Sequence, residues 1–316
     1  MKDRVRTLLR LAPMPGMLAR ALLDTEHPLL AQIVPMRRCN LACGYCNEYD
    51  DVSKPVPLAT VEGWLDKLRE LRTEIVTLSG GEPMMHPDVA KIIAGIRRRK
   101  MTAGLITNGY YLQPERIEEL NDAGLEYLQI SIDNVRPDNV SQKSLKVLDR
   151  KLQNLAQHAR FHVNVNSVLG SGCPNPEDAL VIARRARELG FSTSVGIIHD
   201  GTGRLTALTP AETAIYEEIA RIGRGLYTRV NRFQRNLIEG KPNDWHCRAG
   251  GRYLYVSEHG VVHYCSQQRE AGSFAKPLAE YTREDVAREF RTKKDCSPYC
   301  TIGCVHRASS LDRWRS

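Results

Sequence analysis

The sequence contains no run of 18 apolar residues, and this excludes a transmembrane helix of ordinary length. Its first residues, Met1 to Arg6, also lack the apolar core and cleavage site of a signal peptide. We therefore expect a cytoplasmic protein. In that reducing compartment, nine cysteines are better explained as metal ligands than as disulfides.

A block of like charge is also missing. Lys and Arg outnumber Asp and Glu by 45 to 37, and the excess of +8 is spread along the chain. This pattern suits an anionic substrate or surface partner and does not predict nucleic-acid binding. The 316 residues, 42% hydrophobic and 26% charged, suffice for one large domain or two unequal ones.

Six apolar runs alternate with amphipathic segments, the pattern of repeated βα units. The expected strands are Gln32 to Met36, Glu74 to Leu78, Ala103 to Thr107, Tyr127 to Ile132, Phe161 to Val168 and Thr193 to Ile198. The helical segments between them include Leu58 to Leu71, Pro114 to Asn121 and Asp178 to Leu189. These units predict an α/β fold, a partial (βα)6 barrel with a parallel sheet and right-handed crossovers. Functional residues gather at the carboxyl ends of the strands in such barrels.

A cluster of three cysteines, Cys39, Cys43 and Cys46, directly follows the first expected strand. Three thiolates leave a four-coordinate metal centre one ligand short, which is typical of a site for chemistry. Short cysteine clusters bind zinc as well as iron–sulfur centres, so the spacing alone leaves the metal open.

The motifs that follow narrow this choice. The cysteine loop, with the aromatic Tyr45, resembles the cluster loop of the radical S-adenosylmethionine (radical SAM) superfamily. After the second strand comes Ser79 to Pro83, which includes Gly80, Gly81 and Glu82 and resembles the SAM-binding motif of that family. Later strands lead to Thr107-Asn108-Gly109 and contain Ser131 and Asp133. The resemblance extends over about residues 30 to 200.

This resemblance implies a [4Fe-4S] cluster on Cys39, Cys43 and Cys46, whose fourth iron is chelated by SAM. It also implies an electron donor such as flavodoxin or ferredoxin, reductive cleavage of SAM to a 5′-deoxyadenosyl radical, and abstraction of a substrate hydrogen. The residues expected to contact SAM are Tyr45, Gly80, Gly81, Glu82, Ser131 and Asp133.

A second group of cysteines lies near the C-terminus. Cys247 precedes, and Cys265 ends, two apolar runs about His259-Gly260 that predict a β-hairpin. Further on, Ser297 and Pro298 are expected to open a helix. That helix would present Cys300 and Cys304, four residues apart, on one face.

The spacing of a cysteine, twelve residues, a glycine, four residues and a cysteine resembles the first half of a SPASM domain or its shorter form, twitch. A full SPASM domain has more cysteines, so the resemblance implies a single auxiliary [4Fe-4S] cluster. Its ligands come from Cys247, Cys265, Cys296, Cys300 and Cys304, and the choice among them stays open. The alternative is a zinc ribbon of the same residues.

These observations divide the chain into three expected parts. They are an N-terminal helical extension (1–29), a radical SAM core barrel (30–235) and a small α+β auxiliary-cluster domain (236–316). In the extension, the basic amphipathic segment Arg4 to Leu11 either packs on the barrel or docks on a membrane surface. Cys173, in a loop after the fifth strand, is either a hydrogen-atom donor to a substrate radical, as in some radical SAM epimerases, or an ordinary loop thiol.

We expect the substrate to be a small molecule, a lipid or a peptide. We expect the enzyme to be an oxidoreductase or a maturase. Only 38 residues precede Cys39, too few for the winged-helix leader-peptide domain of many peptide-modifying relatives. We therefore expect a small molecule or lipid before a peptide. From a different class, the rival interpretation is a non-catalytic zinc protein whose basic surface binds nucleic acid.

Overall fold

The protein is built on one nine-stranded sheet, with the strand order β6-β5-β4-β3-β2-β1-β7-β8-β9. A computed structural model describes residues 14–170, 173–198, 206–223, 233–269, 272 and 274–315. The strands are β1 (Leu30–Met36), β2 (Ile75–Gly80), β3 (Thr102–Thr107), β4 (Tyr127–Ser131), β5 (His162–Gly170), β6 (Ser192–Ile198), β7 (Tyr253–Val256), β8 (Val261–His263) and β9 (Lys276–Pro277).

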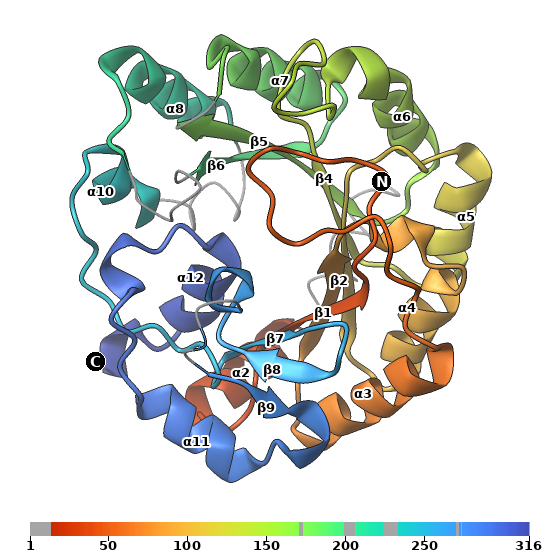
Figure 1. Cartoon of the computed structure of the whole chain (residues 1–316), viewed down its shortest axis with the longest axis vertical. Coiled ribbons are helices and arrows are strands. Elements are labelled where there is room, and N and C mark those ends of the chain that lie inside the picture. Colours follow the sequence, from red (N-terminus) through yellow and green to blue (C-terminus); the bar gives the residue numbers. More distant parts are fainter. Residues whose placement is uncertain are drawn as a thin grey trace.

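The first six strands are parallel and neighbour one another in chain order. The helices that follow them are α3 (Leu58–Glu70), α4 (Val89–Arg98), α5 (Pro114–Asp122), α6 (Leu145–His158), α7 (Glu177–Glu188) and α8 (Pro210–Ile222). Figure 1 shows these helices on the outside of a curved row of strands. In the described part of the chain, β1 pairs with β2 and β7 and not with β6, so the barrel stays open. The predicted α/β fold with a partial barrel is confirmed.

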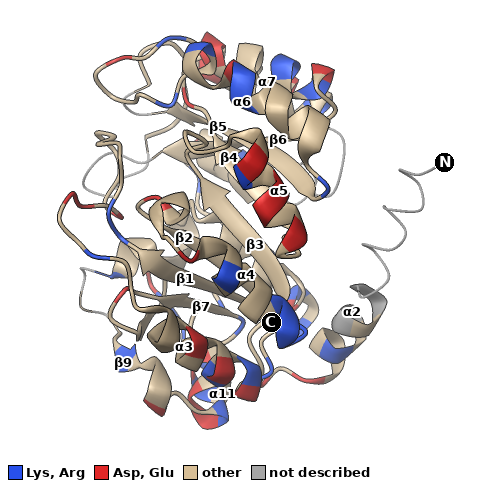
Figure 2. Ribbon diagram, turned by 90° about the vertical axis from the view of Figure 1, so that its right-hand side faces the viewer, with Lys and Arg blue, Asp and Glu red and all other residues tan. Residues whose placement is uncertain are grey.

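Apolar spacing explains why the helices cover the sheet. In α4, for example, Val89, Ile92, Ile93 and Ile96 share one buried face and belong to the main hydrophobic core. The strands β1 to β8 contain no Lys, Arg, Asp or Glu, and Figure 2 shows the charged residues on the outer helices and loops. Charged side chains at the carboxyl ends of these strands must therefore come from the loops there.

The C-terminal segment extends the same sheet. Strand β7 runs parallel to β1, with Leu30 opposite Tyr253, and β7 and β8 form the antiparallel hairpin that the sequence predicted about Gly260. The helices of this segment are α10 (Gln234–Ile238), α11 (Arg283–Arg291) and α12 (Gly303–Ser310). The sheet is thus continuous across the expected boundary at residue 236, and the domain division stays a prediction.

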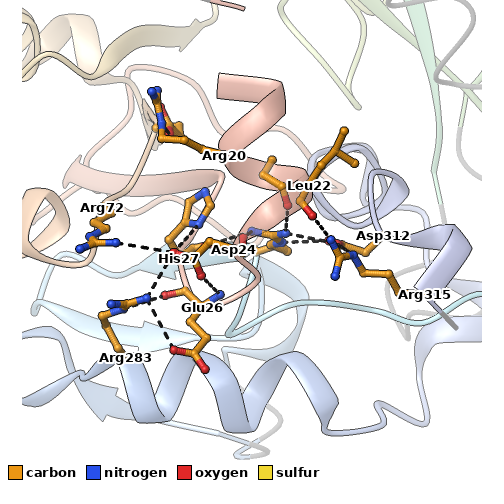
Figure 3. A network of polar contacts seen from close by, with 12 residues as sticks. Arg20, Leu22, Asp24, Glu26, His27, Arg72, Arg283, Asp312 and Arg315 are labelled. Carbon is orange, nitrogen blue, oxygen red and sulfur yellow. Dashed lines mark hydrogen bonds and ion pairs between the residues drawn. The ribbon is translucent and has the colours of Figure 1, made fainter. Parts of the chain in front are cut away.

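The first and last segments of the described part of the chain contact each other. Helix α2 (Met14–Leu23) leads to Asp24, which pairs with Arg72 at 3.7 Å and with Arg283 at 3.2 Å. Near the other terminus, Arg315 donates a hydrogen bond to the carbonyl of Leu22. Figure 3 shows these contacts joining the first described residues to the last. The segment Arg4 to Leu11 lies outside the described residues, and no described helix is long and apolar enough to cross a membrane.

Candidate active site

The loop with Cys39, Cys43 and Cys46 leaves the carboxyl end of β1 and is closed by backbone hydrogen bonds. The amide of Cys39 donates to the carbonyl of Asp50 over 2.9 Å. Midway, the amide of Gly44 donates over 2.9 Å to the carbonyl of Val140, beyond β4, and Figure 1 shows the loop crossing in front of the sheet. The loop therefore spans the carboxyl ends of the parallel strands.

The three cysteine side chains line one cavity of about 110 Å³. Cys39 Sγ accepts a hydrogen bond from the amide of Leu41 at 3.4 Å and lies 3.7 Å from Nδ2 of Asn108. Burial raises the pKa of Cys39, and it raises the pKa of Cys46 to about 11. Other residues around the cavity are Leu41, Tyr49, Gly80, Gly81, Ile106, Thr107, Asn108, Ser131 and Lys143.

This donor set fits a cluster held by three thiolates. Thiolate sulfur is the usual ligand of iron–sulfur clusters, and N–H donors aimed at the sulfurs tune them. No three Cys, His, Asp or Glu side chains among the described residues converge closely enough to hold a single metal ion. The cysteines thus share a cavity that is not preformed for one ion.

Gly80 and Gly81 let the end of β2 lie against the end of β1. Gly80 has a φ of 113°, and a Cβ there would lie 2.4 Å from Val34 Cγ1. A Cβ on Gly81 would lie 2.0 Å from the carbonyl oxygen of Arg37. Any side chain at either position would displace the backbone that leads into Cys39. Both glycines also line the cysteine cavity, so no side chain of theirs blocks the predicted contact of their backbone with SAM.

Glu82 is fully buried and joins two strand ends. Its carboxylate accepts hydrogen bonds from the amide of Met84 (2.8 Å), the hydroxyl of Thr107 (2.8 Å) and the amide of Asn108 (2.7 Å). Burial raises its pKa to about 7. Thr107 and Asn108 line the cavity, so Glu82 fixes part of its wall. A direct contact from Glu82 to SAM remains a prediction.

Tyr45 and Asp133, both expected to contact SAM, contact each other. The Tyr45 hydroxyl donates to Asp133 Oδ2 over 2.5 Å, and the same oxygen accepts from the Ser141 hydroxyl at 2.7 Å. The other oxygen, Oδ1, is buried and has no hydrogen-bond partner among the described residues. A buried carboxylate oxygen without a donor is costly, so Oδ1 is available to a ligand hydroxyl or amine.

Sequence reasoning missed Lys143, in the loop between β4 and α6. Its ammonium lies 2.5 Å from the Tyr45 hydroxyl and 3.0 Å from Asp133 Oδ2. Burial alone would lower the pKa of Lys143, but the nearby Asp133 and Tyr45 raise it well above its usual value. It is the one cation among the described residues around the cysteine cavity. In the sequence, Lys143 lies between an expected strand and a helix, as other basic loop residues do. Its position alone therefore did not mark it as a site residue.

Ser131 and Cys173 line two different cavities near this polar group. Ser131 ends β4 and lines the cysteine cavity, whereas Cys173 lines a smaller neighbouring cavity together with Tyr45 and Asp133. Burial, helped by Asp133, raises the pKa of Cys173 to about 12, so its thiol stays protonated. The structure therefore brings Cys173 beside the candidate site.

Four C-terminal cysteines form a second group. Cys247 and Cys265 are buried at the two ends of the hairpin segment, and burial raises their pKa values to about 11 and about 12. Burial also raises the pKa of Cys300 strongly, with further contributions from Cys247, Cys265 and Cys296. Cys304 packs against the cluster of buried residues that contains Cys247 and Cys265. Burial raises the pKa of the buried Tyr253, and both Cys304 and Cys265 add to this effect.

The expectation that Cys300 and Cys304 share one helix face is wrong. Ser297 is the first residue of a 3-10 turn, Ser297–Tyr299, and the N-cap position belongs to Cys296, which makes no capping hydrogen bond. Cys300 is extended, with a ψ of 128°, and α12 begins three residues later. The carbonyl of Cys300 lies 3.1 Å from Nε2 of His306, whose ring stacks between Phe233 and Trp245. This contact holds the Cys300 backbone outside the helix.

Comparison with known structures supports this architecture. SuiB of Streptococcus suis, bound to its precursor peptide SuiA, superposes over 94% of this chain and 76% of that one, with a TM-score of 0.65 and 15% identity. The anSMEcpe structure with AdoMet and a peptide covers 85% of each chain, with a TM-score of 0.59 and 14% identity. At such low identity the likeness shows the fold alone.

Sequence relatives share shorter segments. A GTP 3',8-cyclase of Aquifex aeolicus is 31% identical over 186 residues, which is 52% of this chain and 56% of that protein. A PqqA peptide cyclase of Gluconobacter oxydans is 36% identical over 110 residues, or 34% of this chain and 30% of that protein. A Fe-coproporphyrin III synthase of Methanosarcina barkeri is 34% identical over 113 residues, 35% of this chain and 28% of the relative.

The chain thus spans from under a third to just over half of the length of these curated relatives. The family described as the Radical SAM superfamily matches residues 33–207, more than half of the chain and the whole set of strand-end motifs. The chain belongs to the radical SAM superfamily.

Proposed function

We propose that this chain is a radical SAM enzyme that binds a [4Fe-4S] cluster through Cys39, Cys43 and Cys46 and SAM beside it. The observation that carries this proposal is the single cavity that the three thiols share with Gly80, Gly81 and Ser131. When bound, the cluster supplies one electron to SAM, which cleaves to methionine and a 5′-deoxyadenosyl radical that takes a substrate hydrogen.

The chain's own residues position this chemistry. Asn108 donates toward Cys39, and its backbone is fixed by Glu82. Asp133 offers its unpartnered Oδ1 to a hydroxyl or amine of SAM, while Lys143 places a positive charge at the cavity wall. Tyr45, Gly80, Gly81 and Ser131 complete the proposed SAM contacts.

We further propose an auxiliary [4Fe-4S] cluster on Cys247, Cys265, Cys296 and Cys300. Burial raises the pKa of Cys300, and Cys247, Cys265 and Cys296 add to this effect, which supports a common location for the four thiols. We assign Cys304 a packing role because it lies in α12 and packs against the buried cluster that contains Cys247 and Cys265. A cluster with four cysteine ligands has no open iron for substrate. It would accept an electron from the substrate radical, so the net reaction would be an oxidation.

Cys173 supports a second candidate reaction. A protonated thiol beside the site can return a hydrogen atom to a substrate radical. This would leave a thiyl radical on Cys173, which one electron from the flavodoxin or ferredoxin and one proton from solvent would convert back to the thiol, so the product has no net change in oxidation state. The substrate is a small molecule, a lipid or a peptide, since the relatives' names point to GTP, a peptide and a porphyrin. A flavodoxin or ferredoxin would supply the electron for SAM cleavage.

Anaerobic reconstitution tests this proposal. The wild type should bind about eight irons per chain and release 5′-deoxyadenosine from SAM. The triple variant Cys39→Ala, Cys43→Ala, Cys46→Ala should keep about four irons and release none. A colourless protein that binds zinc and not SAM would instead support the rival zinc protein.

A further inference from the structure

Glu48, two residues after Cys46, connects the first cysteine loop to the segment that carries Cys265. Its carboxylate Oε1 accepts a hydrogen bond from the hydroxyl of Tyr255 at 2.8 Å. The side chain of Ser266, the residue directly after Cys265, lies beside the same carboxylate. Tyr255 is fully buried and lies in β7, the first strand of the hairpin segment. One side chain therefore reaches both the strand before the hairpin turn and the residue after Cys265.

A second contact ties the same two segments together. Arg37, two residues before Cys39, lies between Asp50 (3.4 Å) and Glu258 of the hairpin turn (3.8 Å). Glu258 in turn accepts two hydrogen bonds from Arg269, at 2.6 and 2.8 Å. The first loop is thus attached to residues 255–269 at its beginning and at its end.

Of these contacts, Glu48 is the one that touches the neighbour of a proposed auxiliary ligand. Moving the Cys46 end of the loop would pull the carboxylate from the buried Tyr255 hydroxyl, and an unpaired buried donor is unfavourable. A change in either segment is therefore resisted by the other.

We propose that Glu48 is a positioning residue that couples the SAM-binding loop to the Cys265 segment. This inference rests on the proposed function, because it assumes that both cysteine groups hold clusters. Coupling between two sites is reciprocal. If bound SAM stabilises the auxiliary segment by some factor, loss of the auxiliary cluster weakens SAM binding by the same factor.

A double-mutant cycle tests the coupling through the SAM dissociation constant. We expect Cys265→Ala to weaken SAM binding about fivefold in the otherwise wild-type protein, at the lower end of common couplings between sites. In a Glu48→Ala background, the same cysteine change should alter SAM binding less than about twofold. Glu48→Gln keeps an acceptor for Tyr255, so we expect it to restore most of the coupling.

Two tyrosine variants provide a matched control and a milder break. Tyr255→Phe removes the hydroxyl that bonds Glu48 and should reduce the coupling. Tyr281→Phe removes an equally buried hydroxyl that donates to the carbonyl of Gly250 at 2.7 Å, away from the first loop, and should leave the coupling intact. The tyrosine pair also serves if Glu48→Ala fails to load iron.

Equal effects of Cys265→Ala in the wild-type and Glu48→Ala backgrounds would overturn the proposal, as would no effect in the wild type. Iron analysis separates this result from a failure of the proposed function. A wild-type protein that holds about four irons, unchanged by Cys265→Ala, lacks the auxiliary cluster, whatever the SAM dissociation constants show.

Discussion

The ammonium of Lys143 lies 2.5 Å from the hydroxyl oxygen of Tyr45, a residue between two of the proposed cluster ligands. The same ammonium lies 3.0 Å from Asp133 Oδ2, which accepts the Tyr45 hydroxyl. The side chain before Cys46 is thereby fixed to the end of β4. The cysteine loop is held by a side-chain contact as well as by its backbone.

Replacing Lys143 should weaken SAM binding at the proposed site more than removing the Tyr45 hydroxyl. Lys143→Met leaves the buried Asp133 carboxylate without its cation, a change that typically costs about 3 kcal/mol or more. We expect SAM binding to weaken at least tenfold, whereas Tyr45→Phe, which spares the ion pair, should cost about 1 kcal/mol. Equilibrium SAM binding to reconstituted protein measures both. Lys146→Met, at an exposed position in α6, is the control, and unchanged binding in Lys143→Met would contradict the assignment.

Glu82 should make the fold less stable as pH rises. Burial raises its pKa from 4.5 to about 7, so the folded chain binds this proton more tightly than the unfolded chain. The stabilisation is fully present below the unfolded pKa of 4.5 and is lost as pH rises to about 7, at roughly 1.4 kcal/mol per pH unit. Glu82→Gln should remove this dependence. Urea unfolding of the cluster-free protein between pH 5 and pH 8 tests this, and parallel pH profiles for the two proteins would refute it.

Most of the fold was predictable because local patterns determine it. Apolar runs and helix starts such as Pro114 gave the βα units to within a few residues. The parallel pairing of β7 with β1 was not predictable, because Tyr253 and Leu30 are far apart in sequence and a short apolar strand carries no signal of its partner. The extended backbone at Cys300 was missed because the contact with His306 overrode the helix signal of Ser297 and Pro298.

The candidate site was predictable where a motif carries it. Cys39 follows β1, Gly80 ends β2 and Ser131 ends β4, so the parallel order of the strands brings them to one cavity. Lys143 and Glu48 act through contacts with residues of other segments, Tyr45 and Tyr255. No spacing rule connects such pairs, so only the folded structure reveals them.

Arg252 should stabilise the contact between the first and last segments of the described part of the chain. Its guanidinium is fully buried, pairs with Asp312 at 2.8 Å and donates to the carbonyls of Ala21 and Asp24 at 2.5 and 2.9 Å. Because Arg252→Met leaves the buried Asp312 carboxylate with Arg315, 3.3 Å away, and removes its fully buried partner, we expect a loss of about 3 kcal/mol in the free energy of unfolding. The double variant Arg252→Met, Asp312→Leu should lose less. Arg160→Met, which breaks exposed ion pairs with Glu118 and Asp122, should change stability least, and denaturant unfolding ranks the three variants.

Cys173 is tested by the origin of the product hydrogen. If its protonated thiol reacts with the substrate radical, turnover in D2O places one solvent deuterium in the product. Cys173→Ala should abolish this incorporation and still release 5′-deoxyadenosine, because the residue lines the neighbouring cavity and not the cysteine cavity. Mass spectrometry of the product measures the label. An unlabelled, oxidised product from the wild type would instead support electron transfer to the auxiliary cluster.

The auxiliary cysteines should separate into ligands and a packing residue. Cys300 lies near Cys247, Cys265 and Cys296, so Cys300→Ala should remove about four irons and impair product formation while sparing 5′-deoxyadenosine release. Cys304 is the second residue of α12 and packs against the buried cluster that contains Cys247 and Cys265. Since we assign it a packing role, Cys304→Ala should retain about eight irons and turn over normally. Iron analysis and the EPR spectra of the reduced proteins distinguish the two variants. If Cys304→Ala lost iron and Cys300→Ala did not, Cys304 would be the ligand and Cys300 the packing residue. Only the loss of a cysteine that binds the cluster should release its iron.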